Sequence, residues 1–264
     1  MAGRRGLMSF VEVAGTRLEY VRLPSARPVS GRPVIVLLHE GLGSVSLWKE
    51  FPQAVADATG CEALVYSRKG YGQSDPITAP RAMRYMHDEA LVVLPELLDR
   101  LAIERPVLFG HSDGGSIALI HAGGSSRPVA GLIVLAPHVL VEDISVTSIA
   151  EAKVAYETAD LRERLAQRHA NVESAFRGWN DIWLHPDFRA WNIEEYLPRV
   201  RVPVLAIQGE QDEYGTLDQI DRIARLAPDV ETLKLADCRH SPHRDQPDAV
   251  IAATVDFVTR RLAR

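Results

Sequence analysis

The feature that most constrains the fold is a series of short apolar runs separated by helical patterns. The runs are rich in β-branched and aliphatic residues and cover residues 33–39, 61–67, 106–112, 129–137, 202–209 and 230–237. Strands that are apolar on both sides suit a sheet buried on both faces, and parallel strands need helical crossovers between them. The alternation therefore predicts an α/β fold with a mostly parallel sheet flanked by helices.

A hairpin and four helical patterns complete this arrangement. Residues 9–23 alternate between apolar and polar side chains around Ala14-Gly15, which predicts an antiparallel hairpin and brings the sheet to about eight strands. Helical patterns cover residues 47–59, 85–103, 216–227 and 247–263. Pro95 lies inside the second pattern and predicts a kink there, because proline removes a helical hydrogen bond.

Residues 139–200 interrupt the alternation. They contain helical patterns and no strand-like run, and structureless loops of that length are uncommon. We interpret them as a helical cap inserted after the sixth strand, with residues 1–138 and 201–264 forming the core. Three tryptophans lie in this segment and either pack within the cap or line a pocket beneath it: Trp179, Trp183 and Trp191.

Composition narrows the class of protein. The 264 residues carry a formal net charge of −5, which argues against nucleic acids or anionic membranes as partners. Two cysteines form no disulfide framework, and the N-terminus has no apolar signal region. No apolar run approaches the roughly 18 residues of a membrane span. We expect a cytoplasmic monomer or homodimer that acts on a small molecule.

The most specific motif is "FGHSDGG" at residues 109–115. It contains G-x-S-x-G as Gly110, Ser112 and Gly114, directly after a strand-like run and before a helical start. In that context the serine lies on a tight, strained turn and presents its hydroxyl at the edge of the sheet. The N–H of Asp113 faces the same point at the positive end of a helix. The motif predicts a nucleophilic serine.

A serine nucleophile needs a base and an acid further along the chain. Asp212 follows the run at 202–209, and His240 follows the last run. Alternatives remain for both roles. His243 is a second candidate base, and the rival acids are Glu142, Asp143, Glu210 and Glu213. His111 should point away from the active face if Ser112 points toward it.

With these motifs, the chain resembles the α/β-hydrolase fold superfamily along essentially its whole length, in the subgroup with a helical cap. The family's oxyanion loop H-G-x-x-G corresponds to "HEGLG" at 39–43, with Glu40 in place of glycine. Its R-G-x-G-x-S stretch corresponds to "RKGYGQS" at 68–74, with one inserted residue. The resemblance implies the triad Ser112, Asp212 and His240. It also implies that the N–H of Gly41 joins that of Asp113 in an oxyanion hole.

The sequence allows two roles each for Glu40 and His138. A carboxylate near a developing oxyanion would oppose catalysis, so we expect Glu40 to turn away and pair with a donor, Arg68 being the first candidate. Alternatively, Glu40 contacts substrate or positions water. His138 ends a strand-like run and should face the cap, either as a structural hydrogen bonder or as a substrate contact.

These features favour a serine hydrolase that cleaves a carboxylic ester or similar acyl bond. No cofactor is expected, and the histidines and cysteines lack metal-binding spacing. One alternative is hydrolysis of a carbon–carbon bond in a ring-cleavage product, for which Arg177 and Arg189 of the cap would bind the anionic substrate. Another is a non-catalytic receptor that has kept the fold.

Overall fold

The computed structural model describes residues 7–262 and is built around an eight-stranded sheet. The strand order is β1-β2-β4-β3-β5-β6-β7-β8, in which β1 and β2 run antiparallel to their neighbours and the other pairs are parallel. The strands are β1 Ser9–Val13, β2 Thr16–Leu23, β3 Ile35–Leu38, β4 Ala63–Tyr66, β5 Val107–His111, β6 Gly131–Leu135, β7 Val204–Gly209 and β8 Val230–Leu235. The predicted mostly parallel α/β sheet and its N-terminal hairpin are confirmed.

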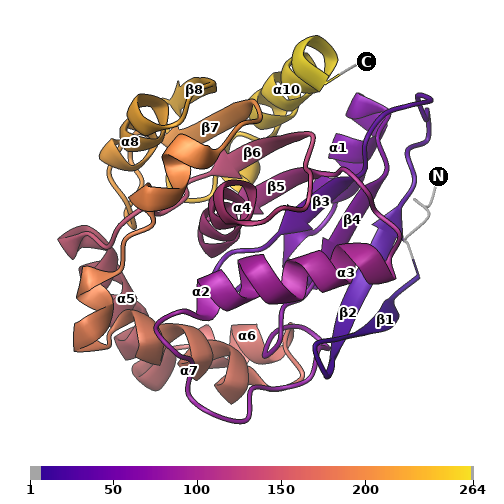
Figure 1. Ribbon diagram of the computed structural model, residues 1–264. Helices are drawn as coiled ribbons and strands as arrows, with labels where there is room; N and C mark the ends of the chain where they lie inside the picture. The colour runs from indigo at the N-terminus through magenta and orange to yellow at the C-terminus, as the bar shows by residue number, and fades with distance from the viewer. Residues whose placement is uncertain (1–6, 263–264) are drawn as a thin grey trace.

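The central strands are buried along their whole length, and their side chains alternate between two cores. Val36 and Leu38 of β3 belong to the core shared with α4 and α8, whereas Leu37 between them belongs to the core shared with α1 and α10. Figure 1 shows helices on both sides of the sheet. This burial on both faces explains why the sequence contains apolar runs without polar interruption.

The helices of the core follow the predicted patterns. They are α1 Phe51–Thr59, α2 Tyr85–Asp88, α3 Leu94–Arg100, α4 Asp113–Gly124, α8 Asp218–Leu226, α9 Pro242–Asp245 and α10 Pro247–Phe257. The short 3₁₀ segment η1 Val45–Trp48 precedes α1, and the π-helical segment η5 Val258–Leu262 follows α10. Another π-helical segment, η2 Glu89–Val93, separates α2 from α3 directly before Pro95. The interruption predicted from Pro95 is therefore a π-helical turn.

Between β6 and β7 the chain forms the helical cap. It comprises α5 Asp143–Thr158, α6 Leu161–Ala166, α7 Val172–Trp183, η3 Pro186–Ala190 and η4 Glu194–Arg199. Figure 1 shows α5, α6 and α7 gathered at one side of the molecule, away from α1 and α10. An isolated antiparallel bridge between Leu140 and Asn192 joins the beginning of this segment to its end. The insertion predicted after the sixth strand is confirmed.

Among the described residues, no helix is both long and apolar enough to cross a membrane. The expectation about a signal sequence concerns in part residues 1–6, which lie outside the described residues.

Candidate active site

Ser112 occupies a strained turn between a buried strand and a helix. It lies between β5 and α4 with φ 52° and ψ −119°, a region that non-glycine residues rarely adopt. The turn is also tight. A Cβ atom on Gly114 would lie 2.1 Å from the carbonyl oxygen of Leu38, and one on Gly110 would lie 2.2 Å from that of Gly114. The glycines of the motif are therefore required by the close approach of backbone to backbone.

The side chains of Ser112, His240 and Asp212 meet at the carboxyl ends of the parallel strands. The Nε2 atom of His240 lies 3.0 Å from the Oγ atom of Ser112, and its Nδ1 atom lies 2.8 Å from Oδ1 of Asp212. Asp212 follows β7 and His240 follows β8, so both loops reach the sheet edge at which β5 ends. The sequence predicted this grouping, and the structure brings the three residues together.

Asp212 is held in place by hydrogen bonds from its own loop. Its Oδ1 atom accepts from the N–H groups of Tyr214 and Gly215 at 2.8 and 3.2 Å, and its Oδ2 atom accepts from the amide of Gln208 at 3.0 Å. Burial raises the pKa of the carboxyl, but His240 and the N–H of Tyr214 outweigh burial and hold the pKa below its ordinary value. Asp212 is therefore an ionised, oriented acceptor for the imidazole.

The backbone of His240 is also held by hydrogen bonds. Its N–H donates to Oε2 of Glu213 at 3.1 Å, and its carbonyl oxygen accepts from Nε2 of His111 at 2.8 Å. Burial disfavours the charged imidazole, but Asp212 and then Glu213 outweigh burial and raise the pKa of His240 above 6.5. Through this bond His111 supports the loop that carries His240.

Two backbone N–H groups near Ser112 have no acceptor. Within residues 7–262, neither Gly41 nor Asp113 donates a backbone hydrogen bond. The Glu40 carbonyl that precedes Gly41 accepts from Nδ1 of His39 at 2.6 Å and from Nη2 of Arg68 at 3.1 Å. These are the residues predicted for an oxyanion hole, and both border the cavity described next.

A cavity of about 150 Å³ opens beside Ser112. It lies between the core and the cap and has mainly apolar walls. Its lining comprises Glu40, Gly41, Leu42, His111, Ser112, Asp113, His138, Ile149, Trp179, Trp183, Tyr214, His240, Ser241 and Arg244. Glu40, His138, Trp179 and Trp183 were candidates for substrate contact, and all four lie in this wall.

The three tryptophans of the cap have different surroundings. Trp179 covers Gly41, where an added Cβ would lie 2.2 Å from the indole ring. The Nε1 atom of Trp183 donates to the hydroxyl of Tyr85 at 3.1 Å. Trp191 is not among the residues that line the cavity and instead stacks on Phe188, with ring centroids 5.6 Å apart. Of the two alternatives for this candidate, Trp191 therefore packs within the cap and does not line the cavity.

Glu40 pairs with a donor, but with a different one from that expected. Its Oε1 atom accepts from Nη2 of Arg244 at 3.0 Å, and its Oε2 atom lies 3.5 Å from Nδ1 of His111. The predicted partner Arg68 binds the backbone carbonyl of Glu40 and not its carboxylate. Burial raises the pKa of Glu40, but His111 and Arg244 outweigh burial and place it well below 4.5.

The rival candidates for base and acid have other contacts. His243 packs against Trp48 at 4.7 Å between ring centroids, and neither of its ring nitrogens has a partner within residues 7–262. Glu142 accepts from Thr216, and Asp143 pairs with Arg189. Glu213 binds the backbone of His240, and Glu210 is exposed. None of these rivals joins Ser112.

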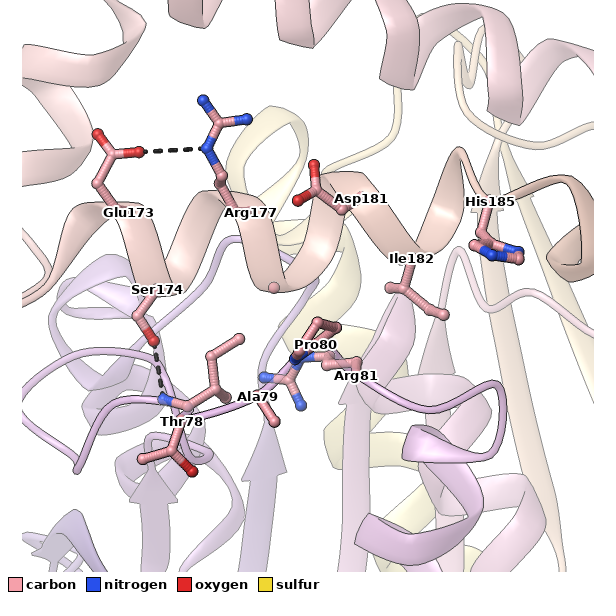
Figure 2. Close-up of a pocket in the computed structure, with 12 residues that line it drawn as sticks. Thr78, Ala79, Pro80, Arg81, Glu173, Ser174, Arg177, Asp181, Ile182 and His185 are labelled. Atoms are coloured by element: carbon pink, nitrogen blue, oxygen red, sulfur yellow. Dashed lines mark hydrogen bonds and ion pairs between the residues drawn. The ribbon is translucent and has the colours of Figure 1, made fainter.

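A second, larger cavity of about 380 Å³ lies elsewhere. Figure 2 shows it between α7 and the loop at residues 77–81, where Glu173 and Arg177 pair on the helix. Its serine, Ser174, accepts from the N–H of Ile77 at 2.9 Å and has no histidine partner within residues 7–262. Ser112 does not line this second cavity, so a substrate bound there would not contact the candidate nucleophile.

Sequence reasoning missed two residues that line the smaller cavity beside Ser112. They are Tyr214 and Arg244, and no local motif marks them.

Comparison with known proteins agrees with this geometry. Residues 35–253 match the family model described as "Alpha/beta hydrolase family". The chain is 24% identical over 259 residues to the sn-1-specific diacylglycerol lipase of Danio rerio, covering 85% of this chain and 78% of that protein. It is 21% identical over 257 residues to 2-hydroxy-6-oxo-6-phenylhexa-2,4-dienoate hydrolase of Comamonas testosteroni, covering 86% and 88%.

Among solved structures, the enol-lactonase from Burkholderia xenovorans is similar, with a TM-score of 0.76 at 22% identity. The similarity covers 96% of this chain and 100% of that one. The names of these three relatives describe different substrates. The similarity therefore supports a shared fold but does not identify a substrate. The family match covers Ser112, Asp212 and His240 together with the strands that place them, and the chain belongs to the alpha/beta hydrolase family.

Proposed function

We propose that the protein is a serine hydrolase that cleaves a carboxylic ester or similar acyl bond of a small molecule. The observation that carries this proposal is the continuous hydrogen-bonded line from Ser112 Oγ to His240, 3.0 Å, and from His240 to Asp212, 2.8 Å. These distances lie within the range required for a nucleophile activated by an adjacent base.

The reaction has two halves. His240 takes the proton of Ser112 as Oγ attacks the carbonyl carbon, and Asp212 stabilises the imidazolium that forms. The N–H groups of Gly41 and Asp113 receive the oxyanion. The imidazolium then protonates the leaving alcohol as the acyl-oxygen bond breaks. In the second half, His240 takes a proton from water as the water oxygen attacks the acyl carbon. The imidazolium then returns this proton to Oγ of Ser112 as the acyl–Oγ bond breaks and the acid leaves.

The test combines labelling with turnover. We expect a fluorophosphonate probe to label Ser112 and the protein to hydrolyse p-nitrophenyl butyrate. Ser112→Ala should lose labelling and about 10⁴- to 10⁶-fold in kcat. Ser174→Ala, at the serine of the second cavity, is the matched control and should retain both. A Ser112→Ala protein with full esterase activity would overturn the proposal, and an unlabelled wild-type protein would favour a non-catalytic receptor.

Carbon–carbon bond hydrolysis is a second candidate, since one similar protein is named as a dienoate hydrolase. The expected cationic residues do not support it. Arg177 pairs with Glu173 at the second cavity, and Arg189 pairs with Asp143. Neither lines the cavity beside Ser112. A vinylogous diketo acid that is turned over faster than p-nitrophenyl butyrate would favour this reaction over ester hydrolysis.

A further inference from the structure

His138 follows β6 on a backbone that is fixed from two sides. Its N–H donates to Oγ of Ser116 at 3.1 Å, and the same hydroxyl donates to its carbonyl oxygen at 2.6 Å. The next residue, Val139, donates its N–H to the amide oxygen of Gln219 at 2.7 Å. Ser116 belongs to α4, the helix that starts beside Ser112. The position of His138 is therefore tied to the nucleophile turn.

The turn that carries His138 also contains backbone strain. Ala136 has φ 44°, which is unfavourable for a residue with a Cβ atom. Residues in this region are strained, and they cluster at functional sites, where the surrounding structure imposes them. Ala136 precedes His138 by two residues, and His138 lines the Ser112 cavity.

The ring of His138 is buried without a hydrogen-bond partner. The residue is 3% exposed, and the structure records no hydrogen bond from either ring nitrogen to another of residues 7–262. The ring lies edge-on to Trp183 at 5.0 Å between centroids and 5.9 Å from His240. The expectation of a structural hydrogen bonder therefore fails for this side chain. Nδ1 is fully enclosed, whereas Nε2 also lacks a partner within residues 7–262 but keeps accessible surface. A polar group inside the protein without a partner is costly, and Nε2 is the ring nitrogen that a ligand in the cavity can reach.

Another buried histidine shows why location matters. His243 also lacks ring partners, but it lies between Trp48 and Phe51 and does not line the cavity. Its surroundings are those of a packing residue. His138 differs because its ring shares a cavity wall with Ser112, so a bound substrate can reach it.

The charge state of His138 defines the kind of group that it can bind. Burial and then the nearby His240 lower its pKa to about 3, so the ring is neutral at physiological pH. A neutral imidazole offers one N–H donor and one lone-pair acceptor. A hydroxyl can donate and accept, so it matches either tautomer. A carboxylate would gain no ion pair here, and Arg244 is already paired with Glu40.

The dimensions of the cavity limit the size of the ligand. Its volume is about 150 Å³, and an apolar protein cavity of about this volume holds one benzene molecule. Ile149, Trp179 and Trp183 form apolar walls around the remaining space. The part of the substrate that enters is therefore compact and mostly apolar.

We infer that the cavity receives a compact, uncharged acyl group that carries a hydroxyl, and that the His138 ring binds this hydroxyl. This inference rests on the proposed serine hydrolase function and adds the substrate class to it. His138 acts as a specificity-determining residue: an acyl group without the hydroxyl leaves the ring unpaired in the complex. Sites that hydrogen-bond a substrate hydroxyl reject the analogue that lacks it more strongly than apolar sites discriminate by size.

The experiment compares methyl butyrate with methyl 2-hydroxybutyrate and methyl 3-hydroxybutyrate, by titrating the acid released. The readout is the ratio of kcat/KM for each hydroxy ester to that for methyl butyrate. Comparing this ratio between wild type and variants cancels the intrinsic reactivity of the esters. We expect His138→Leu to lower the ratio for at least one hydroxy ester by about tenfold or more.

Two further variants separate binding from folding. His138→Asn keeps a donor and an acceptor and should retain part of the preference, whereas His185→Leu, at an exposed histidine of the second cavity, should leave the ratio unchanged. A ratio that is the same in wild type and His138→Leu would overturn the inference and indicate that water alone satisfies the ring. Turnover of none of the three esters by a protein labelled at Ser112 would also overturn it. Absence of Ser112 labelling would instead reject the proposed function.

Discussion

The guanidinium group of Arg68 donates a hydrogen bond to the carbonyl oxygen of Glu40 at 3.1 Å. That carbonyl shares a planar trans peptide unit with the N–H of Gly41, so fixing one end directs the other in the opposite direction. The same guanidinium lies 3.8 Å from the carboxylate of Asp113, whose N–H is the second candidate donor to the oxyanion. One buried arginine therefore connects both halves of the candidate oxyanion hole.

Arg68→Lys should lower kcat with little change in KM. Arg68 donates to the carbonyl oxygens of both His39 and Glu40. A lysine amine cannot hold these two carbonyls and approach Asp113 in the same planar arrangement. Loss of one oxyanion donor costs about 10²- to 10³-fold in kcat, and displacing it should cost about tenfold to 10²-fold. Affinity for an alkyl boronic acid, which resembles the tetrahedral intermediate, should fall in parallel. Arg177→Lys is the control on an exposed arginine. Unchanged boronate affinity in Arg68→Lys would contradict a positioning role.

The pH dependence of kcat/KM should follow the protonation of His240. The base must be neutral to accept the proton of Ser112, and Asp212 holds the pKa of His240 above 6.5. Activity should therefore rise with pH through a midpoint above 6.5, and it should be lost as the imidazole is protonated below that midpoint. In Asp212→Asn, the midpoint should move down and kcat should fall by about 10⁴-fold. Rates of fluorophosphonate labelling measure the midpoint in both proteins. A wild-type midpoint at or below 6.5 would oppose this assignment.

Glu40→Gln should reduce stability near neutral pH. The carboxylate accepts from Arg244 and lies 3.5 Å from Nδ1 of His111, and a neutral amide is a weaker partner for both, at about 1 kcal/mol of unfolding free energy. The folded pKa is well below the ordinary 4.5. The contribution is therefore complete above the unfolded pKa and is lost as pH falls through the folded pKa. Urea unfolding at several pH values should show a deficit that shrinks below about pH 4.5.

Glu210→Gln, at an exposed acid of the neighbouring loop, is the control for this measurement. A Glu40→Gln protein with unchanged stability but greatly reduced turnover would instead place Glu40 on the substrate.

The nucleophile turn offers a graded test of packing. A Cβ atom on Gly114 would meet the backbone oxygen of Leu38 at 2.1 Å, whereas one on Gly115 would meet the side chain of Pro137 at 2.9 Å. Gly114→Ala should therefore cost about 3 kcal/mol or more, and Gly115→Ala clearly less. Thermal and urea unfolding of the two variants measures the difference. Equal stabilities would show that the turn relaxes more easily than its contacts indicate.

Local patterns predicted the strands and the positions of Ser112, Asp212 and His240, since each follows an apolar run. The carboxyl ends of parallel strands lie at one edge, so residues that follow such runs are brought together by topology alone. Trp179 and Trp183 lie four residues apart on α7 and share a face, as helical spacing predicts. Trp191 follows a 3₁₀ segment, and no comparable spacing relates it to that face.

The partners of Glu40 could not be predicted in this way. Arg244 is 204 positions away, and its contact depends on how the loop after β8 folds over the sheet edge. The bond between His111, the last residue of β5, and the His240 carbonyl likewise joins residues 129 positions apart. Each contact has one partner in the segment after β8, where no repeating pattern relates sequence to space.

The core and the cap contribute different parts of the candidate site. Within residues 7–262, the hydrogen-bond partners of the His240 ring and the Asp212 carboxylate all come from outside the cap. The cap contributes Ile149, Trp179 and Trp183 to the cavity wall. Substitutions on α5 and α7 can therefore change the shape of the cavity during evolution, while the contacts that hold Asp212 and His240 stay the same.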